Sequence, residues 1–365
     1  MPTPLPTKTN PTPSIAIENQ IGFTKVPLGL AGPLTITGRH QRAPVSAPLA
    51  TLEATLVASC SRGCKALQLC GGVKAAALAE GMSRAPVFFF GTVDDAVAFY
   101  ERVPELEGQF RETAEKTSRF CKLVKIVPHI IGKAVHVKMI YTTGDACGQN
   151  MTTIATHTAC KAFLKSEGAK EAKVIGYQLE GHFAPDKKMA WGNVHELGRG
   201  VKVMAWATLT NEVCKKVLKC STAALHRTMD IARDGMIRNG GMGNSINTAN
   251  VMAAMFIACG QDVASVLEGG FSHLSHEIDP ETQDLTVSMY FPCMVVGTMG
   301  GGTGYESQKE TLEIIGCFGP GKKFALAETV AAFCLALDLS TASAFADDTF
   351  SQSHQRLARG GKSRL

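Results

Sequence analysis

The feature that most constrains the fold is a change of hydrophobic period in the first half of the chain. Residues 133–141 alternate, with Val135, Val137 and Met139 on one face, which is the period of a β-strand. Strand and helix patterns around this segment follow the order strand, helix, strand, strand, helix, strand, which is typical of a split βαβ, ferredoxin-like domain. Five of these six elements have assigned segments: the strands 87–90, 133–141 and 173–178 and the helices 96–103 and 150–165.

Helical patterns dominate on both sides of this region, over residues 47–80, 212–230, 248–267 and 324–346. We therefore predict an α+β fold in which a small ferredoxin-like α+β domain is inserted into a large, mostly helical domain. The predicted segments are a disordered N-terminal tail over 1–15, a discontinuous large domain over 16–85 and 180–350, a small domain over 86–179, and a mobile C-terminal flap over 351–365.

Composition narrows the class of function. The chain has 365 residues, of which 45% are hydrophobic and 19% charged, as expected for a compact globular protein. Aromatic residues are only 7% and are not interleaved with basic ones, which argues against nucleic-acid binding. The net charge of +5 suits a small anionic ligand. The 12 cysteines form no Cys-x-x-Cys pair and lie in apolar stretches, so we predict buried free thiols.

Location signals are few. We predict neither a secretory signal nor a membrane-spanning helix, because the long uncharged run over 240–261 is densely apolar only over 251–259. The chain ends in Ser363, Arg364 and Leu365, which resemble the Ser-Lys-Leu peroxisomal address. Cytoplasm and peroxisome therefore both remain open.

Glu53 is the first candidate for catalysis. It lies in the apolar stretch 50–67, beside the stripe of a predicted helix that includes Leu52. A carboxylate there must be paired or must keep its proton, and a proton-donating carboxyl is what general-acid chemistry needs. The alternative is a solvated Glu at the helix edge, or one paired with Arg62 or Lys65.

Two glycine-rich segments could approach a ligand closely. Residues 144–150 follow the alternating strand and open a helix, whose free N–H groups can bind phosphate, although the Gly-x-Gly-x-x-Gly fingerprint is missing. Residues 297–304 surround Met299 with glycine and threonine. This second segment is either a ligand loop or the bulged end of a strand or a tight hairpin.

Further polar residues stand apart in the sequence. Asp186, Lys187 and Lys188 form a loop cluster that suits an anionic substrate or is simply an exposed group of charges. Asp262 could orient such a lysine, or it is a helix C-terminal residue. His354, in the polar tail, could protonate a leaving group from a mobile flap, or it is an ordinary exposed histidine.

Metal binding is not predicted. His273 and His276, followed by Glu277, are the residues whose types could suggest a metal site. Their spacing lacks a convincing third ligand, so we expect a surface or core role for them and no metal site.

Taken together, the motifs resemble the catalytic domain of the 3-hydroxy-3-methylglutaryl-coenzyme A reductase family, from about residue 17 to 359. Several family motifs recur in the same order, which makes the resemblance specific. They cover residues 18–22, 27–34, 56–66, 81–86, 117–120, 144–151, 186–188, 257–262 and 297–303.

The resemblance implies two successive hydride transfers from NADPH to the acyl-coenzyme A thioester, which give mevalonate and free coenzyme A. In that reaction Lys187 matches the residue that stabilises the developing oxyanion, and Asp262 matches its hydrogen-bonded partner. Glu53 matches the proton donor at the aldehyde stage. His354 matches the histidine that protonates the departing thiolate.

The resemblance also implies binding residues. NADPH is preferred over NADH because Arg119 and Arg359 suggest partners for a 2′-phosphate. The implied cofactor residues are Ser118, Arg119, Phe120, Asp145, Gly148, Gln149, Asn150, Met299, Gly300, Gly301 and Arg359. The implied acyl-coenzyme A residues are Ser59, Arg62, Arg84, Glu180, His182, Asp186, Lys188 and Asn250. The small domain is then the NADPH-binding domain and the large one binds substrate and coenzyme A.

The family also implies an assembly and an N-terminal difference. The segment at Glu18 and Asn19 matches the family's dimer motif, so we expect a homodimer or homotetramer with active sites between subunits. Membrane-anchored relatives carry an N-terminal region that this sequence does not have, so we expect no membrane partner.

Departures from the family concern the substrate. Glu180 and His182 replace a serine and an asparagine of the substrate loop, and Asn247 replaces a histidine. A carboxylate near the substrate's own carboxylate is repulsive unless it is turned away, protonated or bound to a cation. The pocket lysine has no clear match, although Arg233 or Arg238 could substitute. These changes leave open a paralogue that reduces another acyl thioester, a non-catalytic homologue that binds ligand without turnover, and an interaction module.

Overall fold

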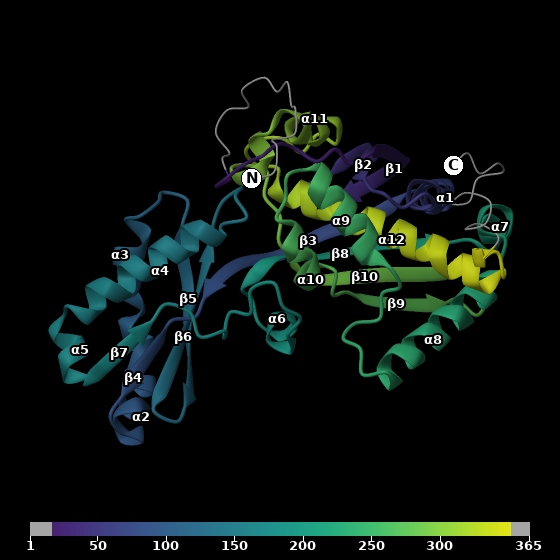
Figure 1. Cartoon of the computed structure of the whole chain (residues 1–365). Helices are drawn as coiled ribbons and strands as arrows, with labels where there is room; N and C mark the ends of the chain where they lie inside the picture. The colour runs from purple at the N-terminus through teal and green to yellow at the C-terminus, as the bar shows by residue number, and fades with distance from the viewer. Residues whose placement is uncertain (1–16, 352–365) are drawn as a thin grey trace. The chain divides into compact units, whose positions relative to one another are not determined.

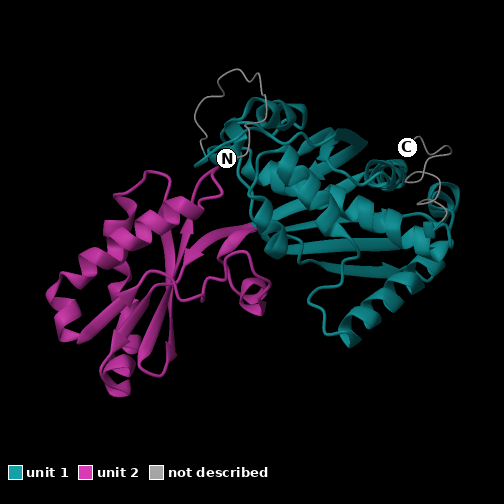
Figure 2. Cartoon of the chain, in the orientation of Figure 1, with its two compact units in different colours: residues 1–78, 202–365 teal, residues 79–201 magenta. Residues whose placement is uncertain are grey.

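The computed structural model describes residues 17–351, which form two compact units. Within that range, unit 1 comprises residues 17–78 and 202–351, and unit 2 comprises residues 79–201 (Figure 2). The chain passes from one unit to the other inside strands β3 (Val73–Arg84) and β8 (Arg199–Leu209). Unit 2 is therefore wider than the small domain predicted over 86–179.

The strands of unit 2 form an antiparallel arrangement. They are β4 (Val87–Phe90), β5 (Lys122–Ile131), β6 (Ala134–Thr142) and β7 (Val174–Gln178). β4 lies between β7 and β6, and β5 pairs with the other edge of β6. The strands predicted over 87–90, 133–141 and 173–178 therefore agree with β4, β6 and β7 to within one residue at each end.

Helices of unit 2 enclose an aromatic core. α3 (Glu107–Glu115) and α4 (Gln149–Leu164) lie side by side (Figure 1). α2 (Val93–Arg102) and η1 (Val103–Leu106) precede α3 in the chain, and α5 (Glu167–Glu171) follows α4. Phe88, Phe99 and Phe163 are buried with ring centroids 5.3–5.9 Å apart. Thr92 caps α2 by accepting the N–H of Asp95, so the acidic pair at 94–95 occupies the first turn and does not supply the cap.

Strands of unit 1 include two antiparallel hairpins. β1 (Leu28–Gly38) pairs with β2 (Arg42–Ala50), and β9 (His273–Ile278) pairs with β10 (Leu285–Met294). β1 also runs parallel to the start of β3, with Ile36 opposite Val73.

Helices of unit 1 gather around α12 (Lys323–Ala346), which contacts α1 (Leu56–Leu69), α8 (Thr222–Arg238) and α9 (Thr248–Ala258) (Figure 1). Over residues 17–351, α12 is the one helix long and apolar enough to cross a membrane, but 89% of its most apolar window is buried. α12 is therefore apolar all round because it is a core helix. The other helical elements of the structure are α6 (Trp191–His195), α7 (Asn211–Val213), η2 (Cys214–Leu218), η3 (Val263–Ser265), α10 (Val266–Gly269), η4 (Gly301–Gly304) and α11 (Glu306–Ile314).

The predicted helices over 47–80 were only partly correct, because this stretch contains the end of β2, helix α1 and most of β3. β3 is rich in alanine and largely buried, so sheet pairing overrides its helical propensity. The large unit also carries β1, β2, β9 and β10, which the expectation of a mostly helical domain missed. The cysteines are all free, and all except Cys70 and Cys147 are buried, as predicted.

Candidate active site

Glu53 lies in an exposed link between β2 and α1. The predicted helix around it was wrong: α1 begins at Leu56, and Leu52 is 85% exposed. Asn250 Nδ2, on α9, donates to Glu53 Oε2 at 3.0 Å, and Thr55 Oγ1 donates to Glu53 Oε1 at 3.4 Å. The structure therefore brings together Glu53 and Asn250, two predicted site residues that are 197 positions apart in sequence.

The N-terminus of α9, which carries Asn250, is fixed by a buried carboxylate that the sequence analysis did not identify. Asp338 of α12 accepts the backbone N–H of Ile246 at 2.7 Å and of Asn247 at 3.0 Å. Burial raises the pKa of Asp338 to about 6, although the two N–H donors oppose the shift. Asn247 Nδ2 also donates to Thr341 Oγ1 at 3.0 Å. An aspartate inside an otherwise apolar helical run was the available signal.

Asp262 stands beside the second glycine-rich loop. It caps η3, where Oδ1 accepts the Ala264 N–H at 3.2 Å. The preceding Gln261 clamps the loop, donating to Gly297 O at 2.9 Å and accepting the Gly297 N–H at 2.8 Å. Asp262 is therefore not a C-terminal residue of α9, which ends at Ala258.

The glycines of this loop are required by geometry. A Cβ at Gly260 would lie 2.3 Å from the carbonyl oxygen of Gly302, so these backbones are in direct contact. Gly300 and Gly301 have φ of 76° and 55°, the left-handed region that favours glycine. Met299, 45% exposed, precedes them. The predicted cofactor residues Met299, Gly300 and Gly301 thus belong to a loop that is held by Gly260 and Gln261, the residues just before Asp262.

Ser59 and Arg62, the predicted coenzyme A contacts, bind α12. Ser59 Oγ lies 2.9 Å from Ser340 Oγ, and Arg62 Nε donates to the same oxygen at 2.9 Å. Arg62 also donates through Nη2 to the Ser340 carbonyl. Burial lowers the pKa of Arg62. Both side chains are thus fixed by the core helix.

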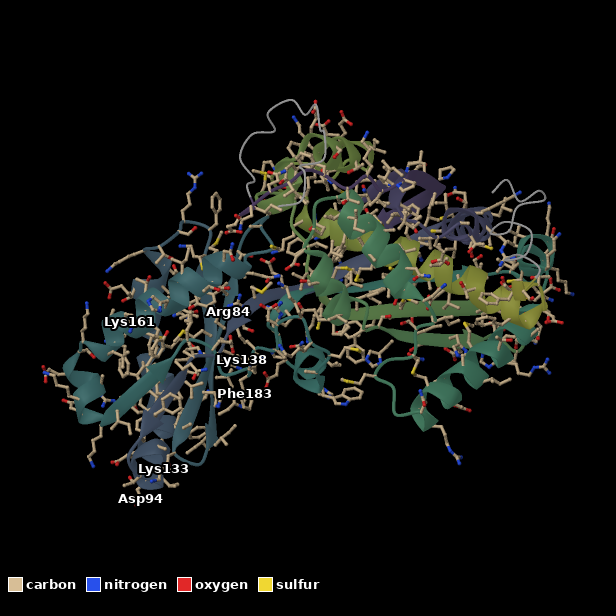
Figure 3. All side chains as sticks on the ribbon, in the orientation of Figure 1. Arg84, Asp94, Lys133, Lys138, Lys161 and Phe183 are labelled. Atoms are coloured by element: carbon tan, nitrogen blue, oxygen red, sulfur yellow. The ribbon has the colours of Figure 1, made fainter. Side chains whose placement is uncertain are left out.

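Asp186 of unit 2 is held between two arginines. Arg199, a fully buried residue that the sequence analysis missed, donates from Nη2 to Asp186 Oδ1 at 2.7 Å. Arg84, labelled in Figure 3, contributes the second guanidinium. Its Nη2 lies 3.6 Å from the other carboxylate oxygen, and its Nε donates to Thr153 Oγ1 at 2.8 Å. This arrangement fixes the start of the predicted Asp186–Lys188 cluster.

The two lysines of that cluster follow directly. Lys187 has φ of 55°, a left-handed conformation uncommon for a residue with a side chain. Lys188 Nζ donates to the Asp186 carbonyl at 3.2 Å. Phe183 in the same loop stacks on His129 with ring centroids 4.2 Å apart, which adds an apolar contact to the charged ones.

Glu180 is turned toward the backbone. Oε2 accepts the Ala85 N–H at 3.2 Å, and Oε1 accepts the His182 N–H at 2.8 Å. His182 has φ of 64°, so the chain turns sharply here. Of the possibilities raised for Glu180, the structure favours a carboxylate that is turned away, toward the backbone N–H groups of Ala85 and His182.

The N-terminus of α4 is the candidate phosphate site. Gly148, with φ of 87°, precedes the helix, and a Cβ there would lie 2.3 Å from Thr143. Phe120 is 52% exposed and lies beside Gly144, and the Arg119 guanidinium stands 4.6 Å from its ring centroid. An aromatic face, a guanidinium and the N-terminus of a helix together suit a dinucleotide.

The remaining predicted residues are placed as follows. Ser118 Oγ accepts the Phe120 N–H at 3.2 Å, and Gln149 and Asn150 open α4. Asp145 lies in the loop before them. His354 and Arg359 lie outside the described residues.

Comparison with known proteins then assigns the chain. The sequence model described as hydroxymethylglutaryl-coenzyme A reductase matches residues 8–359. The chain belongs to this family. It is 38% identical to the 3-hydroxy-3-methylglutaryl-coenzyme A reductase of Methanocaldococcus jannaschii over 94% of this chain and 84% of that protein. It is 39% identical to the enzyme of Methanothermobacter thermautotrophicus, over 94% and 85%. This is a family of NADPH-dependent oxidoreductases.

A solved structure supports the fold. The class II 3-hydroxy-3-methylglutaryl-coenzyme A reductase of Streptococcus pneumoniae, bound to NADPH, superposes with a TM-score of 0.71 at 18% identity, over 90% of this chain and 87% of that one. At that identity the likeness concerns the fold alone, which is a mixed α+β fold with an antiparallel sheet.

Proposed function

We propose that this protein reduces 3-hydroxy-3-methylglutaryl-coenzyme A to mevalonate and free coenzyme A, using two molecules of NADPH. The proposal rests chiefly on the hydrogen bond between Asn250 Nδ2 and Glu53 Oε2, which joins two residues that the family resemblance places at the reacting thioester. Family membership over residues 8–359 supports it.

The chemistry assigns one task to each catalytic residue. Lys187 supplies positive charge to the oxygen that becomes negative when hydride adds to the thioester carbonyl. Asp262 orients that lysine. His354 gives a proton to the departing thiolate, and Glu53 gives one to the aldehyde oxygen during the second hydride transfer. Asn250 holds the Glu53 carboxyl in place.

Unit 2 is the proposed NADPH-binding domain, with a ferredoxin-like topology. Strand order β7, β4, β6, β5 with antiparallel pairing supports that topology. The nicotinamide dinucleotide would place its phosphates at the N-terminus of α4, with Arg119 near the 2′-phosphate and Phe120 against a ring. The loop that carries Met299, in unit 1, is the other segment that the family resemblance assigns to the cofactor. NADPH supplies the hydride when it is bound.

The substrate's carboxylate is proposed to meet Arg84 and Lys188. Glu180 does not oppose this, because its two oxygens accept backbone N–H groups. A paralogue for another acyl thioester remains the second candidate. The observation that favours it concerns Arg233, one of the two candidates to replace the pocket lysine. Its guanidinium is paired with Asp230 at 2.8 Å and with Asp234 at 3.3 Å.

A homodimer or homotetramer with active sites between subunits is part of the proposal. The segment that follows Glu18 and Asn19 exposes Ile21 and Phe23, 66% and 44% exposed. Phe23 and Ile17, the latter 62% exposed, border a hollow of about 840 Å³ that Tyr305 also lines. Exposed apolar side chains at a hollow support a subunit contact. We place the protein in the cytoplasm, or in peroxisomes if the C-terminal Ser-Arg-Leu is read.

Replacing Lys187 tests the proposal. Lys187→Ala should abolish thioester reduction while NADPH binding and the melting temperature are kept, because only the charge at the developing oxyanion is lost. Lys173→Ala is the matched control, since Lys173 is also in unit 2 and also has φ of 55°. Unchanged turnover in Lys187→Ala, or equal losses in both variants, would contradict the assignment.

A further inference from the structure

A cluster outside the proposed active-site residues has the chemistry of a metal centre. His226 and Asp230 lie one turn apart on α8, and His276 comes from β9, which α8 contacts (Figure 1). All three belong to unit 1. Each offers one ligand atom, and the three atoms lie within 4.8 Å of one another. Within residues 17–351 this is the one group of three or more such side chains close enough for a shared ion.

The spacing of the ligand atoms fits a small divalent ion. His226 Nε2 lies 3.4 Å from Asp230 Oδ2, and His276 Nε2 lies 3.7 Å from Asp230 Oδ1. Zinc bonds of about 2.0–2.2 Å in a tetrahedral site place neighbouring ligand atoms roughly 3.3–3.6 Å apart. The two imidazole nitrogens are therefore already near the distances from the carboxylate that a shared ion requires.

His276 gives a second, independent indication. Its side chain is only 2% exposed, and its buried Nε2 has no hydrogen-bond partner. Its Nδ1 lies 2.8 Å from Nδ1 of His226, so one of these two nitrogens carries the proton between them. If His276 donates, its Nε2 is a buried lone pair facing a carboxylate. If His226 donates, His276 Nε2 carries a hydrogen that has no acceptor within hydrogen-bond distance, since Asp230 Oδ1 is 3.7 Å away. A cation at Nε2 resolves the first case.

We propose that His226, Asp230 and His276 bind a divalent first-row transition-metal ion, with Zn²⁺ the best match to two imidazoles and one carboxylate. The fourth position would be water. Binding through both Nε2 atoms puts protons on both Nδ1 atoms, so the contact between the rings must open by rotation of a side chain. Arg233, 2.8 Å from Asp230 Oδ1, would be displaced from that oxygen by the ion.

The geometry of β9 explains why the histidines that are adjacent in the sequence do not form a site, although the expectation of no metal site did not foresee the cluster with α8. Side chains alternate along β9, so His273 and Glu277 face the side opposite to His276. The grouping of His273, His276 and Glu277 that the sequence suggests therefore cannot close around one ion. The other two ligands of the proposed site come from helix α8, and His226 precedes His276 by 50 residues in the sequence.

Metal titration of the untagged full-length protein tests the proposal. Zn²⁺ followed by calorimetry, and Co²⁺ followed by its visible absorption bands, should each show one tight equivalent without the intense band of a cobalt–thiolate bond. Asp230→Asn and His276→Ala should each lower the affinity for this ion by more than the roughly 10–100-fold that is typical when an outer-shell partner of a metal ligand is lost. Asp230→Asn keeps the shape of the side chain, so it covers the case in which His276→Ala fails to fold.

His273→Ala is the matched control, since it removes a histidine from the other face of the same strand. We expect His273→Ala to bind Co²⁺ as the wild type does. Zn²⁺ should raise the melting temperature of the wild type and of His273→Ala, but not that of Asp230→Asn. Absence of a tight equivalent in the wild type would overturn the proposal. Equal binding by the wild type and Asp230→Asn would overturn it as well, because the ion would then sit elsewhere.

Discussion

The two units stabilise their functional segments by different means. Unit 2 has an aromatic core beneath α4, with Phe88, Phe99 and Phe163 in mutual contact. Unit 1 is built on α12, which buries charged side chains along with its apolar ones. Glu328 accepts the N–H groups of Gln41 and Ala77 at 2.8 and 3.0 Å, and Asp338 holds the segment before α9.

This difference has a physical consequence. Apolar burial stabilises a fold with little dependence on pH, whereas a buried carboxylate ties stability to its own protonation. We therefore expect unit 2 to respond most to loss of volume, and unit 1 to respond to pH and to loss of hydrogen-bond acceptors. Four substitutions test this difference between the two units.

The largest effect is expected from the core of unit 2. Phe99→Ala should lower the free energy of unfolding by about 3–5 kcal/mol, because it removes a ring packed against Phe88, Phe90 and Phe163 and leaves a cavity. Denaturant unfolding measures the change. Val97→Ala, on the same helix and 41% exposed, should cost less than about 0.5 kcal/mol. Similar costs for the two would show that unit 2 does not depend on its aromatic core.

A pH-dependent effect is expected in unit 1. The pKa of Asp338 is raised to about 6 in the folded state, so its contribution to stability is full below pH 4 and is lost as pH rises through 6. A shift of about two units corresponds to roughly 3 kcal/mol. Unfolding of wild type and Asp338→Asn across this range should show the slope in the wild type alone. A constant difference across the range would contradict the pH dependence.

The clamp on the glycine loop should have a moderate effect. Gln261→Ala removes two hydrogen bonds to Gly297, each worth about 0.5–1.5 kcal/mol, so the free energy of unfolding should fall by about 1–3 kcal/mol. The KM for NADPH should rise with it, if Met299 and its neighbours contact the cofactor. Gln308→Ala is the comparison, because it loses only a long hydrogen bond of 3.5 Å to Ile257 O and an exposed one of 2.7 Å from the neighbouring Ser307 Oγ. A variant with normal stability and KM would show that the loop is held by other contacts.

The smallest effect is expected at Glu180. Glu180→Gln keeps one acceptor for the Ala85 and His182 N–H groups, and the KM for the thioester should change by less than about 3-fold, or 0.7 kcal/mol. If the carboxylate instead faces the substrate, removing its charge should lower KM by tenfold or more. Steady-state kinetics separates these outcomes.

The sequence predicted unit 2 better than unit 1 for identifiable reasons. Alternation over 133–141 and the run at 87–90 are strong local patterns, and β6 and β4 occupy them. β3 is alanine-rich and buried over much of its length, so neither period marks it. β1 and β2 are punctuated by glycine and proline, which hid their hairpin.

The same limits apply to the candidate site. The family resemblance assigned both Glu53 and Asn250 to the site, but the predicted helix around Glu53 was wrong, because Thr51 and Thr55 interrupt it before α1 begins. Arg199 and Asp338 act through contacts made only after folding, with Asp186 and with the Ile246 N–H. No spacing in the sequence records such contacts.

Reduction of 3-hydroxy-3-methylglutaryl-coenzyme A itself is the most direct test of the account. Purified protein is mixed with NADPH and this thioester, the loss of reduced nicotinamide absorbance is followed, and mevalonate is quantified. We expect brisk oxidation of NADPH, with one mevalonate formed for every two NADPH consumed. Protein that binds NADPH but oxidises none with this thioester would contradict it, and other acyl thioesters would then have to be tried.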